Sequence, residues 1–462
     1  MKIHKNIIYN IITPISLLIF CAGCESFVEI PLPDTELNTS FVFEDVATAE
    51  AAITAIYASL RDEGLLTGKV SGISHQLGVY SDELTYYGPS ENLSYQFYLN
   101  NLSASDTRME SLWNYSYEQL YAANSALEGI RQSSALSEEQ RIFLTGEALF
   151  LRGLIHFYLV NLYGDIPYAD STDYNQNSTS ARMESTTVYQ YIIEDLQTAV
   201  KQLPTAYHSP DRVRPNRAAA QSLLARVYLF QGDWQNASNM ASAVLNQTDR
   251  YLLESPALTF LKGSTSTIWQ LSPSQVGYNT HEASTFIFTA GPPPQSALSE
   301  DLVAAFSNED LRKDAWIHSI HDASETWYMP YKYTLNLYEG SGMEYSKVIR
   351  LAEVYLIRAE ARVQFGDLIG AVEDLNVILN RAGLEKSLAT TKEAILEQIY
   401  LQSRLEFFTE HGHRYFQLKR RGALDAELSN IKPGWNSTDI LWPIPDSEIS
   451  LNPNLNPQNP GY

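Results

Sequence analysis

Cysteine is almost absent from this sequence. The 462 residues include only Cys21 and Cys24, and both lie near the N-terminus. If the chain is cut before Cys24, a single cysteine remains and no intramolecular disulfide can form. Cysteine-based zinc sites are excluded for the same reason.

Positive charge is also scarce. The chain has 32 Lys and Arg residues against 54 Asp and Glu residues, which gives a formal net charge of −22. A surface of this sign repels nucleic acid and anionic lipid headgroups. The composition therefore argues against a nucleic-acid partner and favours a neutral ligand over a polyanionic one.

A hydrophobic run long enough to span a membrane is missing from the N-terminus. The apolar stretch over residues 7–23 is broken by Asn10 and Pro14, and a spanning helix needs about 20 apolar residues. Lys2 and Lys5 precede this stretch. A charged start followed by a short apolar segment is typical of a secretion signal.

The end of this segment indicates lipidation. Ala22 and Gly23 come just before Cys24, as in a bacterial lipobox, although Cys21 stands where leucine is usual. We therefore expect a signal peptide at 1–23 and a lipid on Cys24. A polar, proline-containing tether at 24–44 would follow.

Most catalytic and metal-binding motifs are missing. The sequence has no HExxH, GxGxxG or GxSxG pattern, so we expect no catalytic residues, no cofactor and no metal site. His411 and His413 form an H-x-H pair without a third ligand at a usual spacing, which favours a structural role. Glu353 and Glu360 share a helical face, but nearby arginines favour ion pairs between helices over an acid/base pair.

Internal similarity is the clearest positive feature. The segments ARVYLFQGDWQNA (225–237) and AEARVQFGDLIGA (359–371) share one frame: Ala, six residues, Gly-Asp, three residues, Ala. Glycine can end a helix in the left-handed conformation, and the following aspartate can cap the next helix. This frame is that of a tetratricopeptide (TPR) helix pair.

Apolar residues with 3.6-residue periodicity predict helices along most of the chain. The expected ranges are 45–62, 109–132, 137–163, 187–203, 216–231, 233–246, 346–365, 367–382, 392–411 and 413–421. Two intervals, at about 63–108 and 251–345, interrupt the pattern and are rich in Gly, Ser, Asn, Pro and aromatic residues. We call them the first and second insertion, and insertions of this length are usually functional.

Eight segments in order resemble the SusD/RagB family of outer-membrane nutrient-binding lipoproteins, from the lipobox to the last residue. They are LWNYSYEQLYAAN (112–124), GEALFLRGLIHFYLVNLYGDIPY (146–168), YIIEDLQTAVKQLP (191–204), NRAAAQSLLARVYLFQGDW (216–234), IRLAEVYLIRAEARVQFGD (349–367), LNVILNRAGL (375–384), SRLEFFTEHGHRYFQLKRRG (403–422) and LWPIPDSEISLNPNLNPQNPGY (441–462).

The resemblance implies an all-α-dominated fold: a TPR-like scaffold of about four helix pairs, with large irregular insertions containing short β segments. It implies a single domain at 45–462 and no catalytic activity. The family's members act as lids on SusC-like TonB-dependent transporters. We therefore expect a cell-surface, lipid-anchored protein of the outer membrane that captures oligosaccharides for such an importer.

Aromatic residues in the insertions are the candidate ligand contacts. Tyrosine (29 residues) outnumbers phenylalanine (17), and a tyrosine ring combines an apolar face with a hydroxyl that suits a wet surface. A sugar ring would place its C–H face on such a ring and its hydroxyls on amides or carboxylates. The candidates by composition and position are Tyr86, Tyr87, Tyr95, Trp327, Tyr328, Tyr331, Asp82 and Asn92.

Two alternatives remain open. The cargo of the same importer could be a peptide, which would need unpaired backbone groups or apolar pockets. A surface glycoside hydrolase is the weaker alternative, because nothing in the sequence isolates a catalytic carboxylate pair. The sequence does not identify the glycan.

Overall fold

The computed structural model describes residues 42–462. The predicted signal peptide (1–23), Cys24 and nearly all of the predicted tether therefore lie outside the described residues. Helices dominate the described chain, and its strands are few and short. This confirms the predicted fold class.

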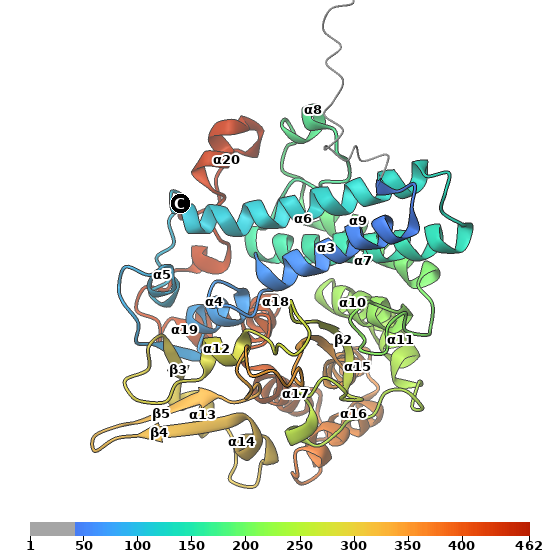
Figure 1. Ribbon diagram of the computed structural model, residues 1–462. Coiled ribbons are helices and arrows are strands. Elements are labelled where there is room, and N and C mark those ends of the chain that lie inside the picture. Colours follow the sequence, from blue (N-terminus) through green and yellow to red (C-terminus); the bar gives the residue numbers. More distant parts are fainter. Residues whose placement is uncertain (1–41) are drawn as a thin grey trace, which may run out of the picture.

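The scaffold is a row of paired antiparallel helices (Figure 1). The four pairs are α3 (Val46–Asp62) with α6 (Thr107–Gln132), α7 (Glu138–Tyr163) with α9 (Ser185–Gln202), α10 (Arg217–Phe230) with α11 (Trp234–Leu245), and α15 (Leu351–Phe365) with α16 (Leu368–Arg381). Neighbouring pairs also contact each other, since α6 packs on α7, α9 on α10 and α11 on α15. Each repeat buries its apolar face against its neighbours, as TPR-like repeats do. Most of the row shares one main core, and a separate smaller core lies between α15, α16 and α17 (Lys392–Phe407).

The turns of the two repeat segments form as the Gly-Asp frame predicts. Gly232 and Gly366 have φ of 71° and 96°, a region that a residue with a Cβ rarely adopts. The side chains of Asp233 and Asp367 then accept hydrogen bonds from the backbone N–H groups of Asn236 and Gly370. Each turn therefore ends one helix and caps the next.

Helix α7 is the centre of the scaffold. Within residues 42–462 it is the one helix long and apolar enough to cross a membrane, but 78% of its most apolar window is buried inside the protein. Phe150, Leu154 and Tyr158 belong to the main core, together with residues from most other helices. Its hydrophobicity is therefore used for packing against α6 and α9.

Two predicted helices are wrong at one end. The predicted helix 346–365 begins as strand β6 (Ser346–Arg350), because this segment pairs with β2 (Thr267–Leu271), a partner that sequence periodicity cannot show. The predicted helix 392–411 is α17 (Lys392–Phe407) and stops four residues early, since Thr409 and His411 adopt positive φ. The chain then continues through α18 (His413–Arg420), α19 (Leu424–Leu428) and α20 (Asp446–Leu451).

Both insertions contain short elements, as expected. The first insertion holds α4 (Ile73–Tyr80), β1 (Leu84–Tyr86) and α5 (Leu93–Tyr98). Besides β2, the second holds α12 (Glu282–Phe286), β3 (Ser296–Leu298), α13 (Glu300–Ala304), α14 (Leu311–Trp316), β4 (Ile317–His321) and β5 (Thr326–Pro330). A four-residue helix, α8 (Tyr174–Asn177), lies between α7 and α9, and short 3-10 turns lie at Pro256–Leu258, Ser437–Ile440 and Pro453–Leu455.

The strands form three separate two-stranded antiparallel sheets: β1 with β3, β2 with β6, and β4 with β5. The β4–β5 hairpin projects at the lower left of Figure 1, away from the helix pair α3 and α6. A small core of Phe288, Ala297, Trp327 and Met329 packs beneath it. The second insertion therefore has apolar packing of its own.

A buried charge cluster joins α14 of the second insertion to β6, α16 and α17. Glu406 on α17 is fully buried and contacts Arg312, Arg350 and Arg381. Burial alone would raise the pKa of Glu406, but the three guanidinium groups hold it well below its usual range. The carboxylate therefore stays charged and fixes four segments together.

Candidate functional site

The two insertions meet through strand pairing. Strand β1 of the first insertion pairs with β3 of the second, with Tyr86 opposite Ser296. Just beyond the pair, the backbone N–H groups of Tyr87 and Gly88 both donate to the carbonyl oxygen of Gln295. Strand β3 also packs against β5, which carries Trp327 and Tyr328. Segments more than 200 residues apart thus form one surface.

A group of four tyrosines lies at this junction, and we call Tyr86, Tyr87, Tyr95 and Tyr98 the tyrosine cluster. The ring centroid of Tyr86 lies 6.0 Å from that of Tyr95 and 6.3 Å from that of Tyr98. Tyr86 is buried, and its hydroxyl donates to the carbonyl oxygen of Pro89. Tyr87 is 38% exposed and is the cluster's open aromatic face. Tyr98 was not among the predicted contacts, although its position within the same helical turn as Tyr95 could have indicated it.

Trp327 supports the cluster from below. Its side chain is 4% exposed, and its indole N–H lies close to the Tyr87 hydroxyl. The ring also fills the space above Gly291, where a Cβ would meet it at 1.9 Å. A ring buried in this way orients Tyr87 and offers no face to a ligand.

The environment of Tyr87 is acidic. Partial burial and then the carboxylates of Glu325 and Glu300 raise the pKa of its hydroxyl. The phenol therefore stays protonated and can both donate and accept a hydrogen bond. Nearby carboxylates supply further acceptors for the hydroxyl groups of a ligand.

The other predicted aromatics divide between faces of the hairpin. Successive side chains of β5 alternate, so Tyr328 points to the side opposite Trp327 and is half-buried against the main core. Tyr331 is half-buried, with its ring centroid 5.1 Å from that of His318. Neither joins the tyrosine cluster: strand pleating turns Tyr328 away from Trp327, and Tyr331 lies beyond the end of β5, against His318 of β4.

Asp82 is a structural residue and not part of an accessible surface. It is 7% exposed, and its carboxylate accepts hydrogen bonds from Arg414 at 2.9 and 2.7 Å. Arg404 lies 2.9 Å from the same carboxylate. The structure corrects the predicted role of Asp82: tertiary contacts with α17 and α18 occupy the group that composition offered to a ligand.

A groove of about 650 Å³ opens beside the tyrosine cluster, between the two insertions and α6. We call it the insertion groove. Its lining includes Asn92 and Gln295 next to the cluster, Tyr115 of α6, and the polar residues Lys69, Arg108 and His281. Its volume falls within the ~300–1,000 Å³ typical of ligand sites. Asn92 also contacts the Tyr86 hydroxyl, so it joins the groove to the cluster.

The charges of the insertion groove are balanced. Lys69 lies 3.4 Å from Glu63, and Arg108 lies 2.6 Å from Asp106. The lining therefore combines one aromatic ring, amides, hydroxyls and paired charges. Such a lining suits a neutral ligand rich in hydroxyl groups. Sequence reasoning missed Tyr115, because it lies in a segment assigned only to the scaffold, and it did not single out Arg108 at the end of the first insertion.

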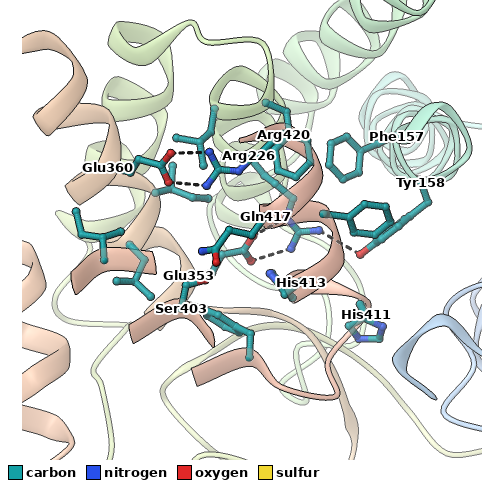
Figure 2. A pocket seen from close by; sticks show the side chains of 17 residues that line it. Phe157, Tyr158, Arg226, Glu353, Glu360, Ser403, His411, His413, Gln417 and Arg420 are labelled. Atoms are coloured by element: carbon teal, nitrogen blue, oxygen red, sulfur yellow. Dashed lines mark hydrogen bonds and ion pairs between the residues drawn. The ribbon is translucent and has the colours of Figure 1, made fainter. Parts of the chain in front are cut away.

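A second cavity, in the core, contains the two glutamates that could have formed an acid/base pair (Figure 2). Glu353 pairs with Arg226 of α10, and Glu360 pairs with Arg420 of α18. The predicted ion pairs between helices are confirmed. Arg350, which the sequence placed beside these glutamates, turns instead to Glu406 and Glu410.

This cavity has a volume of only about 50 Å³, far below that of a ligand site. His411 and His413 line it, as Figure 2 shows. The His411 ring bonds the backbone carbonyl oxygen of Lys347, and the His413 ring stacks on Phe407. The pair is structural, as the sequence predicted. Across residues 42–462, no group of three His, Cys, Asp or Glu side chains is arranged to hold a metal ion.

Comparison with protein families gives two matches. Residues 35–229 match a family described as "Starch-binding associating with outer membrane", and residues 304–462 match one described as "SusD family". Among characterised sequences, SusD-like protein P2 of Formosa agariphila is 27% identical over 98% of this chain and 99% of its own length. SusD-like protein P25 of the same organism is 23% identical over 97% and 98%.

Solved structures share the fold. A SusD-like carbohydrate-binding protein from Bacteroides fragilis has a TM-score of 0.78, with 19% identity over 90% of this chain and all of its own. A laminarin-binding SusD-like protein has a TM-score of 0.74, with 22% identity over 90% of this chain and 99% of its own. At this level of identity the match is one of fold alone.

Proposed function

Since the chain belongs to the SusD/RagB family, we propose that it is a non-catalytic carbohydrate-binding lipoprotein that captures oligosaccharides at the junction of its two insertions. The observation that carries the proposal is the position of Tyr87. This ring is exposed, supported by Trp327, and adjacent to a neutral groove of about 650 Å³.

The chemistry of this junction suits a sugar. The face of Tyr87 offers an apolar platform for the C–H side of a pyranose ring, and Glu300 and Glu325 offer acceptors for its hydroxyls. Asn92 and Gln295 extend the same surface into the insertion groove. A chain of several sugar units could therefore run from the tyrosine cluster into the groove.

The proposal includes a place and a partner. Lipid on Cys24 would hold the chain on the outer membrane at the cell surface, and the tether at 24–44 would let the domain at 45–462 swing as the lid of a SusC-like TonB-dependent importer. The supporting observations are the lipobox-like sequence and the family membership. Replacing Cys24 by Ala should abolish surface retention while leaving the affinity of the domain for its ligand unchanged. Loss of both would contradict a purely anchoring role.

The test is binding to a panel of neutral oligosaccharides, measured by calorimetry on wild type and on Tyr87→Ala. Removing the exposed aromatic face should weaken binding about 10- to 150-fold, because burying such a side chain contributes roughly 1.5–3 kcal/mol. Tyr338→Ala is the matched control, since this tyrosine is 71% exposed and lies outside the cluster. Unchanged affinity in Tyr87→Ala would refute the site.

Two other outcomes would redirect the function. A peptide that co-purifies with the chain and is displaced by no glycan would move the cargo to peptides. Release of shorter sugars from a polysaccharide by the purified chain would indicate a hydrolase. The second outcome is not expected, because the two glutamates of Figure 2 are each locked to an arginine.

A further inference from the structure

A third concave surface lies on the helical scaffold, away from both insertions. It has a volume of about 580 Å³ and is bounded by α6, by the segment around α8 and by α20. We call it the scaffold groove. In Figure 1 these three elements lie at the upper end of the molecule, far from the β4–β5 hairpin. We propose that the scaffold groove is a second carbohydrate site, specific for neutral sugar chains, and this inference rests on the proposed function.

Helix α6 separates the scaffold groove from the insertion groove. Arg108 and Tyr115 line the insertion groove, whereas Tyr117 and Tyr121 line the scaffold groove. Tyr115 and Tyr117 are about 200° apart around the helix, at 3.6 residues per turn. One helix therefore presents tyrosines to two separate hollows.

The wall formed by α6 carries an aromatic stripe. Trp113, Tyr117 and Tyr121 are four residues apart and so share one face of the helix. The ring centroids of Trp113 and Tyr117 are 4.7 Å apart, and Trp113 is anchored edge-on against Tyr163 of the core. The stripe runs outward from this buried tryptophan to Tyr121, which is 54% exposed.

The segment around α8 adds a second exposed aromatic ring. Tyr174 on α8 is 79% exposed and lines the same groove as Tyr121. A single exposed tyrosine on a protein surface is common and indicates nothing. Here two largely exposed tyrosines, from two different elements, line the same groove. Aromatic faces with hydroxyl tips suit sugar rings, which are apolar on their faces and polar at their edges.

Polar side chains alternate with these rings. Asn114 and Glu118 follow Trp113 and Tyr117 by one position each and also line the groove, and Glu448 lines it from α20. Glu118 and Glu448 make this lining acidic, and burial together with the charge of Glu110 raises the pKa of Glu448. Carboxylates accept hydrogen bonds from sugar hydroxyls but repel uronates and sulfated sugars. The groove therefore favours neutral sugars.

The walls are held in place before any ligand arrives. The Tyr117 hydroxyl donates to the carbonyl oxygen of Pro167 at 3.0 Å, and Asn452 donates to that of Ser180 at 2.7 Å. The Thr172 hydroxyl donates to Glu128 on α6 at 2.6 Å. The segment around α8 is thus bonded both to α6 and to the C-terminal segment. A preformed site loses little conformational entropy on binding.

The experiment compares the full chain with Tyr121→Ala, Tyr174→Ala and the double variant, alongside Tyr87→Ala and the Tyr338→Ala control. The probes are laminarin, xyloglucan, galactomannan and amylopectin fragments, with oligogalacturonate as the anionic counterpart. Because both scaffold-groove tyrosines are exposed, the melting temperature of the variants should stay at the wild-type value. Calorimetry would give the affinity and the number of sites.

The wild-type chain should bind a neutral probe at two sites. The double variant should keep the site at the insertions and bind at the scaffold groove at least ~100-fold more weakly or not at all. Tyr87→Ala should weaken the site at the insertions and leave the scaffold groove unchanged. Oligogalacturonate should not occupy the scaffold groove. If the double variant still binds at two sites, this inference is overturned and the proposed function stays intact.

Two further results would also overturn it. If the double variant loses co-purification with an outer-membrane transporter but binds every glycan normally, the scaffold groove is a protein-docking surface. If no neutral probe binds the wild-type chain at all, both this inference and the proposed function fail.

Discussion

Replacing Asp82 by Asn should destabilise the fold without changing ligand affinity. Its carboxylate receives two hydrogen bonds from Arg414 and lies 2.9 Å from Arg404, and its side chain is only 4% exposed. Burial alone would raise the pKa of Asp82, but the guanidinium groups lower it below its usual value. The native state thus depends on the charged form.

The magnitude follows from the geometry. Removing one partner of a buried ion pair costs about 3–5 kcal/mol, because the remaining charge stays buried without compensation. In Asp82→Asn two guanidinium groups lose this partner, although Arg414 keeps Glu427 at 3.2 Å. We therefore expect a loss of about 3 kcal/mol in the free energy of unfolding, measured by urea denaturation at pH 7.

The matched control is an exposed pair. Asp211 lies 3.0 Å from Lys262, with both side chains about one-third exposed. Asp211→Asn should cost less than ~1 kcal/mol, as solvent-exposed pairs do. The refuting result for Asp82→Asn is wild-type stability together with a loss of glycan binding. That outcome would return Asp82 to the ligand surface that its place in the sequence suggested.

Three further substitutions test the packing around the site. Burial and the neighbouring Asp82 raise the pKa of Glu83 to about 8. A carboxyl group whose pKa is raised on folding does not lower the free energy of unfolding when the pH is below its unfolded-state pKa. It lowers that free energy by the full amount when the pH is above its folded-state pKa. The stability advantage of Glu83→Gln over wild type should therefore grow from pH 5 to pH 8 by several kcal/mol, at ~1.4 kcal/mol per pKa unit. A pH-independent difference in urea denaturation would contradict it. Glu406→Gln should lower the free energy of unfolding by about 3–5 kcal/mol, since three arginines lose a buried charged partner; a value under 1 kcal/mol would show that the cluster is dispensable. Gly291→Ala should cost roughly 1–3 kcal/mol and shift tryptophan fluorescence, because the new methyl group would collide with Trp327. Gly263→Ala, with open space around it, is the control, and equal effects in both would refute the collision.

The scaffold could be predicted almost residue by residue. Helix α7 was expected at 137–163 and is Glu138–Tyr163, and α16 was expected at 367–382 and is Leu368–Arg381. Apolar periodicity and capping residues act within a few positions of one another, so they are visible in the chain. The exceptions are β6, which is a strand only because β2 lies beside it, and the end of α17, which stops at Phe407.

The candidate site could be predicted by region but not by residue. Composition correctly pointed to both insertions as aromatic and polar, yet among its candidates only Tyr87 forms an open aromatic face of the tyrosine cluster. Trp327 is buried and Tyr328 turns to the other side of β5. Exposure depends on what packs against a ring, and for Trp327 that partner is Gly291, 36 positions earlier in the chain.

The sequence by itself determined the class of the protein: an acidic, helix-dominated chain with paired repeats and two polar-aromatic insertions. These properties come from local spacing and summed composition, which require no knowledge of distant contacts. Only the tertiary structure decided which polar groups are free to meet a ligand. Arg404 and Arg414 lie more than 300 residues from Asp82, and their contact turns a candidate ligand residue into part of the core. The same folding brings Tyr115 of α6 and Gln295 of the second insertion to the lining of one groove, so the groove exists only once the chain has folded.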